Sequence, residues 1–98
     1  MDKIFNLNGL AMRARKIVSG DELFESIRNQ KVHLVILASD AGANTKKKVN
    51  DKCAFYNVKI LEIEDSKRMN HAIGKKNRMA IGITDEGFSK SILNCWKG

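Results

Sequence analysis

The sequence predicts an α/β fold: a three-layer α/β/α sandwich around a four-stranded mixed, largely parallel sheet. Short apolar runs alternate along the chain with amphipathic helical patterns of about ten residues, and strands joined by helices form right-handed crossovers with helices on both faces of the sheet. The chain has 98 residues, no proline and no Gly/Ser-rich linker. We therefore expect residues 1–98 to form a single domain.

The spacing of the apolar residues places the elements in order along the chain. We expect a helix over 2–15, a strand over 16–18, a helix over 20–29, a strand over 32–37, a helix over 44–56, a strand over 58–63, a short helix from Asp65 or Ser66 to Ile73, a strand over 79–84 and a last helix after Asp85. The run 32–37 is rich in branched apolar side chains, which is typical of a strand covered on both faces. His33 is its only polar residue.

Each helix shows one apolar stripe, and we expect these stripes to form the core. The first stripe consists of Ile4, Phe5, Leu7, Leu10, Ala11 and Ala14; the second of Leu23, Phe24 and Ile27; the third of Thr45, Val49, Cys53 and Tyr56; and the last of Phe88, Ile92 and Cys95 or Trp96. The four phenylalanines fit mostly into such stripes. An aromatic platform for stacking single-stranded bases is therefore not evident.

Polar residues and glycines mark the helix ends. Asp2 and Asp85 are in N-cap positions, and Ser19-x-x-Glu22 matches a capping box, in which two side chains satisfy unpaired backbone N–H groups. Gly74 stands where a helix commonly ends in a left-handed residue.

The charge balance favours an anionic partner. Eighteen Lys and Arg residues against eleven Asp and Glu residues give a formal net charge of +7. Such an excess is typical of proteins that bind nucleic acid or an anionic membrane surface. No apolar run approaches the roughly 20 residues of a membrane span, and the first residues lack the features of a signal peptide, so we expect a cytoplasmic protein that does not bind membranes.

Metal, cofactor and catalytic motifs have little support. Cys53 and Cys95 lie far apart and match no zinc or CxxC spacing, so we expect buried free thiols, no metal and no cofactor. His33 and His71 have no nearby nucleophile in a recognisable activating arrangement. The segment 74–77 has a glycine and lysines but lacks the other residues of a phosphate-cradling P-loop. We expect no enzymatic activity.

Basic residues gather in three clusters: Arg13, Arg15 and Lys16; Lys46, Lys47, Lys48 and Lys52; and Lys75, Lys76 and Arg78. Arginine and lysine bind phosphates, and the first N–H groups of a helix also suit an anion, so the segment 13–22 indicates RNA binding. The third cluster follows Gly74 in a turn, where a loop can present backbone N–H groups and three cations together. The lysines of the second cluster point in several directions around a helix, so only part of them can serve one surface.

Several segments together resemble the ribosomal L-seven-Ae family of kink-turn RNA-binding proteins, over nearly the whole chain and most of all its small bacterial members. These segments are Gly9–Lys16, Val18–Glu22, Leu34–Asp40 with Asn44–Lys48, and His71–Gly74 before Met79–Asp85. The resemblance implies a four-stranded α/β/α sandwich whose RNA-binding face is built from the start of the second helix and the loop after Gly74.

The resemblance also implies roles for individual residues. The family's glycine-x-asparagine (or lysine)-glutamate-threonine segment falls on 19–23, where Glu22 matches and would accept from guanine edges at sheared G·A pairs. Asp21 is an acceptor where the family has a donor, and Leu23 lacks the hydroxyl of threonine. The residues expected to bind RNA are Arg13, Arg15, Lys16, Ser19, Gly20, Asp21, Glu22, Lys46, Ile73, Gly74, Lys75, Lys76, Asn77 and Arg78.

We therefore expect a non-catalytic, monomeric RNA-binding protein that recognises a structured, internally looped RNA, with ribosomal RNA as its partner. An alternative is an adaptor that binds ribosomal or transcription proteins, because basic surfaces also bind acidic proteins. A small nucleotide-binding enzyme is a third and weaker hypothesis.

Overall fold

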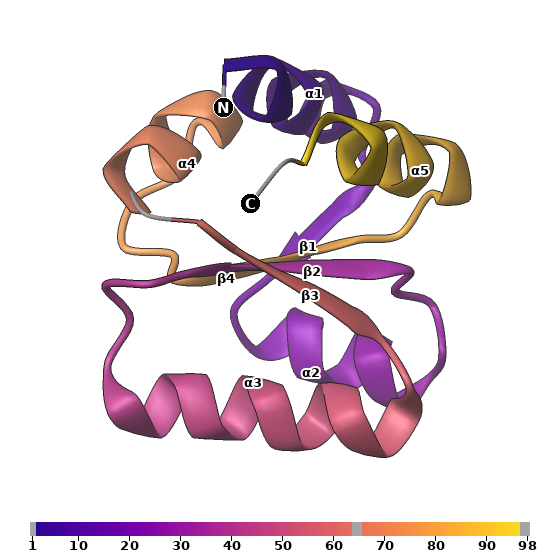
Figure 1. Ribbon diagram of the computed structural model, residues 1–98, viewed down its shortest axis with the longest axis vertical. Helices are drawn as coiled ribbons and strands as arrows, with labels where there is room; N and C mark the ends of the chain where they lie inside the picture. Colours follow the sequence, from indigo (N-terminus) through magenta and orange to yellow (C-terminus); the bar gives the residue numbers. More distant parts are fainter. Residues whose placement is uncertain (1, 64–65, 97–98) are drawn as a thin grey trace.

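The computed structural model describes residues 2–63 and 66–96. Over these residues the chain forms five helices and four strands in the alternating order that the sequence predicts (Figure 1). They are α1 (Asp2–Arg13), β1 (Ile17–Ser19), α2 (Asp21–Arg28), β2 (Leu34–Ala38), α3 (Ala43–Tyr56), β3 (Lys59–Ile63), α4 (Ser66–Ile73), β4 (Ala80–Ile83) and α5 (Glu86–Cys95). Asp65, the alternative start of the fourth helix, and the side chain of Asp2 lie outside the described part.

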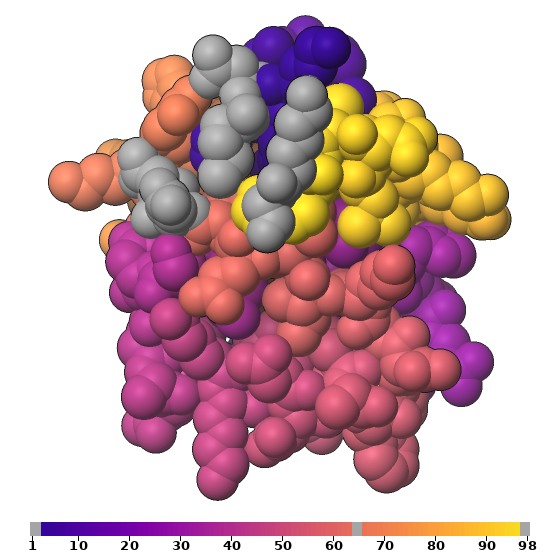
Figure 2. Space-filling view, viewed as in Figure 1, coloured from indigo at the N-terminus to yellow at the C-terminus, as the bar shows by residue number. Residues whose placement is uncertain are grey.

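The elements form three layers. Helices α1, α4 and α5 cover one face of the sheet, and α2 and α3 cover the other (Figure 1). Strand β2 shows why both faces are needed: Leu34 and Ile36 pack into one core cluster, while Val35 and Leu37 pack into the other. Side chains of α4 and α5 stand out on opposite sides of the molecule (Figure 2). The predicted sandwich and the strand covered on both faces are confirmed.

The sheet is mixed, but the prediction that it is largely parallel is wrong. Its strand order is β1-β4-β2-β3, and only the β2 and β3 pair is parallel, whereas β4 runs antiparallel to both β1 and β2. The physical reason lies in α4. This helix has eight residues, about 12 Å at 1.5 Å per residue, and it does not return the chain to the edge where β3 began. Strand β4 therefore starts at the edge where β3 ends and runs back.

Three core assignments need correction. Leu10 is 48% exposed and Ala14 is also exposed, whereas Asn8 is fully buried on the inner face of α1 beside Ile4. Phe55 is 79% exposed, and its ring forms a T-shaped pair with the ring of Tyr56, with 4.8 Å between the ring centroids. Helix α3 buries the narrower stripe of Val49 and Cys53 instead. No helix in the described ranges is long and apolar enough to cross a membrane.

Candidate nucleic-acid interface

The start of α2 is a glycine turn and not a capping box. Ser19 is still part of β1, where it pairs with Ile81, and Gly20 is the N-cap with no side-chain hydrogen bond. Gly20 has φ 65° and ψ −141°, a conformation that is essentially restricted to glycine. The capping prediction fails because α2 begins one residue later than expected, so that Gly20, which has no side chain, stands in the N-cap position in place of Ser19. By contrast, Asp85 does cap α5 by accepting from the backbone N–H of Phe88 at 2.9 Å.

Helix α2 lies close to the sheet because Gly82 has no side chain. A Cβ atom on Gly82 would lie 2.7 Å from Cδ1 of Leu23, which is buried in the core. Gly82 also pairs with Val18 of β1, the strand that leads directly into α2. These contacts place the first turn of α2, with the exposed Asp21 and Glu22, at the edge where β1 ends.

The loop after α4 starts with a left-handed glycine, as the sequence predicts. Gly74 has φ 69°, its N–H donates to the His71 carbonyl, and the N–H of Lys75 donates to the Asn70 carbonyl at 3.0 Å. This pair of hydrogen bonds is the Schellman pattern that ends a helix. Asn77 also has a positive φ, 60°, so the loop turns twice before β4.

The side chain of Asn70 fixes the end of this loop. Its Nδ2 donates to the carbonyl oxygen of Arg78 at 2.8 Å, and its Oδ1 accepts from the N–H of Arg78 at 2.9 Å. Asn70 is buried, and Nδ2 also donates to the Ser66 carbonyl at 2.7 Å. Sequence reasoning missed this residue. A polar residue beside Met69 on the buried stripe of α4 was the available signal, because a buried amide needs partners.

The two segments meet at Gly20 and Arg78. A Cβ atom on Gly20 would lie 2.9 Å from Nη1 of Arg78, so the guanidinium rests against the bare backbone at the start of α2. A hollow of about 320 Å³ is lined by Met12 at the end of α1 and by residues after α1, before and within α2, and after α4: Arg15, Ser19, Glu22 and Lys75. Gly20 and Arg78 line a different hollow, against Thr45 and Val49 of α3. The structure thus brings together the main parts of the expected RNA-binding face.

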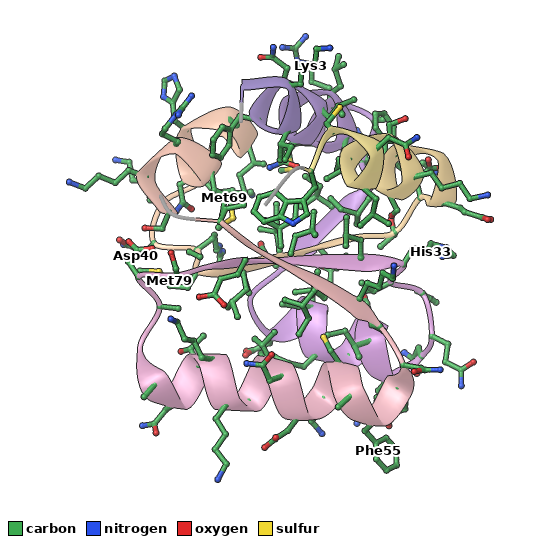
Figure 3. The ribbon with its side chains drawn as sticks, in the orientation of Figure 1. Lys3, His33, Asp40, Phe55, Met69 and Met79 are labelled. Carbon is green, nitrogen blue, oxygen red and sulfur yellow. The ribbon has the colours of Figure 1, made fainter. Side chains whose placement is uncertain are left out.

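Asp40 and Met79 lie at this same end of the sheet, and His33 lies at the opposite end (Figure 3). The Ser66 hydroxyl donates to Asp40, and this hydrogen bond holds the pKa of the Asp40 carboxyl below its ordinary value. Asp40 is therefore an anion at the margin of the loop. Its bond to Ser66 ties the segment after β2 to the first turn of α4.

Several more of the expected site residues lie apart from the hollow that contains Glu22. Lys46 forms an ion pair with Glu62 on the outer strand β3, with 3.2 Å between Nζ and Oε1. Lys16 is exposed before β1, at the opposite end of that strand from Ser19. Arg13 lines a different hollow, between α1 and α4.

Catalytic and metal-binding groups are not assembled here. The described residues hold no group of three or more His, Cys, Asp or Glu that could bind a metal ion. Cys53 and Cys95 are free; Cys53 is buried, and burial raises the pKa of its thiol to about 11, which makes it a poor nucleophile at neutral pH. What the site does offer is an exposed carboxylate, Glu22, among side-chain cations and the N-terminal turn of a helix.

Residues 2–93 match the model of the Ribosomal protein L7Ae/L30e/S12e/Gadd45 family. The chain belongs to this family. It is 44% identical to the RNA-binding protein YlxQ of Bacillus subtilis (strain 168) over 92% of this chain and 91% of that protein, and 47% identical to the RNA-binding protein YlxQ of Enterococcus faecium over 98% and 93%. Neither the family description nor these names denote an enzyme, in agreement with the expected non-catalytic role.

Solved structures give the same result for the fold. A protein with unknown function from Bacillus halodurans C superposes with a TM-score of 0.89 at 41% identity, covering 94% of both chains. The Giardia lamblia 15.5kD RNA binding protein superposes with a TM-score of 0.76 at 18% identity over 92% of this chain and 78% of that one, which shows a shared fold. The family membership expected from the sequence is confirmed.

Proposed function

We propose that this chain is an RNA-binding protein that recognises a structured, internally looped RNA of the kink-turn kind through the start of α2 and the loop 74–78. The observation that carries this proposal is the contact between Gly20 and Arg78, which makes one face from two segments far apart in the sequence. Two relatives above 40% identity that are named RNA-binding proteins support the same class of partner.

The chemistry of the face suits this partner. The carboxylate of Glu22 is exposed and accepts hydrogen bonds, and amino and imino groups on base edges donate them. Arg15 and Lys75 are exposed cations in the same hollow, and the exposed Lys76 follows Lys75 in the loop. These side chains suit phosphates, which position an RNA without reading its sequence. A carboxylate that shares its hollow with Arg15 and Lys75 favours a site in which base edges and backbone lie close together, as they do where an RNA helix bends at an internal loop. We propose ribosomal RNA as this partner, because the family that the chain belongs to is described as a ribosomal protein family.

A titration tests the proposal. A kink-turn RNA with tandem sheared G·A pairs is compared with a duplex of equal length in which these pairs are replaced by Watson–Crick pairs, over a series of salt concentrations. We expect tighter binding of the kink-turn and a slope of log K against log salt of about −2 to −5, as roughly three to six phosphate contacts give. Equal affinity for the two RNAs would contradict kink-turn recognition, and a slope near zero would contradict the phosphate contacts.

A further inference from the structure

A hollow of the described surface lies outside the proposed site, between α1 and α4. It has a volume of about 840 Å³, and basic side chains from both helices are part of its lining: Arg13 from α1, and Lys67, Arg68 and His71 from α4. None of its described lining residues is acidic. A hollow with this lining favours an anion.

The walls of this hollow are held in place by close packing. A Cβ atom on Gly9 would lie 3.1 Å from the carbonyl oxygen of Ala72, so α1 and α4 cross at short range. The guanidinium carbon of Arg68 lies 4.7 Å from the centroid of the Phe5 ring, a cation–π contact that ties α4 to α1. The cations are therefore presented by two fixed helices and not by a loop.

The hollow continues toward the proposed site. Lys67 and His71 also line a second hollow of about 520 Å³, together with Lys75 and Lys76. Lys75 in turn lines the hollow that contains Glu22. Lys67 and His71 are four residues apart in α4, so they lie on one side of the helix, about 6 Å apart along its axis. Lys75 follows two residues after the helix ends.

We propose that Arg13, Lys67, His71 and Lys75, here called the α4 track, bind the phosphate backbone of an RNA helix that extends from the site at Glu22. The inference rests on the proposed function, because it takes the RNA at Glu22 as its starting point. Basic side chains without an aromatic platform suit a duplex, whose grooves are recognised mainly by shape and backbone. Asp40 stands at the margin of the second hollow, where it accepts from Ser66. The track also gives Arg13 a place in the interface from which it otherwise lies apart.

The test compares two matched double variants. Arg13→Gln/Lys67→Gln removes two charges from the α4 track, and Lys47→Gln/Lys52→Gln removes two exposed charges from α3 on the other side of the sheet. Each is titrated against a kink-turn RNA with long flanking helices, and against RNAs in which one or the other flanking helix is cut back to the internal loop. We expect the track variant to lose about tenfold in affinity for the long RNA and about 1.5 from its salt slope, as two lost phosphate contacts imply.

The loss is expected to disappear for one of the shortened RNAs, and the α3 variant is expected to behave like the unmodified protein on all of them. Equal losses in both variants, or a loss that does not depend on helix length, overturn the α4 track and leave the proposed function standing. If the unmodified protein does not prefer the kink-turn, yet the track variant still loses duplex affinity, the proposed function fails and the track stands. Absence of RNA binding, or displacement of the RNA by an acidic peptide with equal loss in both variants, overturns the track.

Discussion

The side-chain amide of Asn70 pairs with both backbone polar groups of Arg78, at 2.8 Å through Nδ2 and 2.9 Å through Oδ1. Asn70, a residue of α4, thus forms with Arg78, the last residue of the loop 74–78, the same pair of hydrogen bonds that the backbone of a neighbouring strand would form. Because the same nitrogen also bonds the Ser66 carbonyl, the amide has no spare donor. The loop is arranged before any ligand arrives, which lowers the entropy lost on binding.

This arrangement predicts a specific effect of Asn70→Asp. The change replaces the donor with a carboxylate oxygen that faces the Arg78 carbonyl, so we expect a loss of stability of about 1–3 kcal/mol and faster hydrogen exchange at the N–H of Arg78. Affinity for a kink-turn RNA should fall by more in Asn70→Asp than in the control variant Asn50→Asp. Asn50 is an exposed residue of α3 whose side-chain amide donates to the Lys46 carbonyl. Unchanged exchange at Arg78 would show that the amide does not hold the loop.

A second prediction concerns Gly20. Alanine at this position meets both an unfavourable positive φ and the guanidinium of Arg78 at 2.9 Å, so we expect Gly20→Ala to lower the free energy of unfolding by about 1–3 kcal/mol. The steric part should vanish in an Arg78→Ala background. A double-mutant cycle by urea unfolding is expected to show a coupling of at least about 0.5 kcal/mol. If the effects of Gly20→Ala and Arg78→Ala on the free energy of unfolding are strictly additive, the cost of alanine at position 20 comes from its backbone conformation and not from contact with Arg78.

Most of this fold follows from local patterns that the sequence displays. The apolar run of β2, the left-handed Gly74 and the cap Asp85 each depend on residues within a few positions of one another. The direction of β4 depends instead on where a short helix delivers the chain, and that is a property of three elements together. Periodicity does not contain this information, so the expected parallel sheet was wrong.

The candidate site, like the fold, could be predicted from the sequence only in part. Cations around a helix start and a glycine loop are visible in the sequence, and the structure brings Arg15, Glu22 and Lys75 to one hollow. The bond from Asn70 to Arg78 and the ion pair of Lys46 with Glu62 join residues on different elements, so no local pattern indicates them. Leu23 is the clearest case. It falls at a family position expected to contact RNA, yet it is 1% exposed in the core.

A third prediction separates specific from general electrostatics in the loop. Lys75→Gln/Lys76→Gln and Lys47→Gln/Lys52→Gln each remove two exposed charges, so neither pair should change the free energy of unfolding by more than about 0.5 kcal/mol per residue. We expect only the first pair to weaken RNA binding strongly, with a salt slope less steep by about 1.4 to 1.8. Equal effects of the two pairs in a fluorescence anisotropy titration would indicate attraction by net charge alone.

The fourth prediction uses the contrast between two buried asparagines. Asn8 is fully buried, and neither Nδ2 nor Oδ1 has a hydrogen-bond partner among the described residues, whereas the amide of Asn70 is fully used. We expect Asn8→Leu to raise the free energy of unfolding by about 1–3 kcal/mol, because an unpaired amide is expensive to bury. Asn70→Leu should lower it. Urea midpoints with unchanged m-values measure both, and a loss at Asn8 would mean that its amide is satisfied in solution.

The last prediction returns to the residue that departs from the family pattern. Asp21 is exposed in the first turn of α2. Its negative charge stabilises the N-terminus of the helix but repels the phosphates of an RNA. Leu23 departs as well, but it is part of the core, so a threonine there would create a cavity and confuse the test. We therefore expect the single change Asp21→Asn, which keeps the shape and supplies a donor, to raise affinity for a kink-turn RNA by about tenfold.

The matched control is Glu25→Gln, which removes one exposed negative charge from the same helix. If Asp21→Asn acts through a hydrogen bond to a base edge, its gain should exceed that of Glu25→Gln and should be lost on the Watson–Crick duplex. If both variants gain equally on both RNAs, position 21 influences binding only through charge. Recognition of the bent RNA would then come from Glu22, the loop 74–78 and the backbone N–H groups at the start of α2.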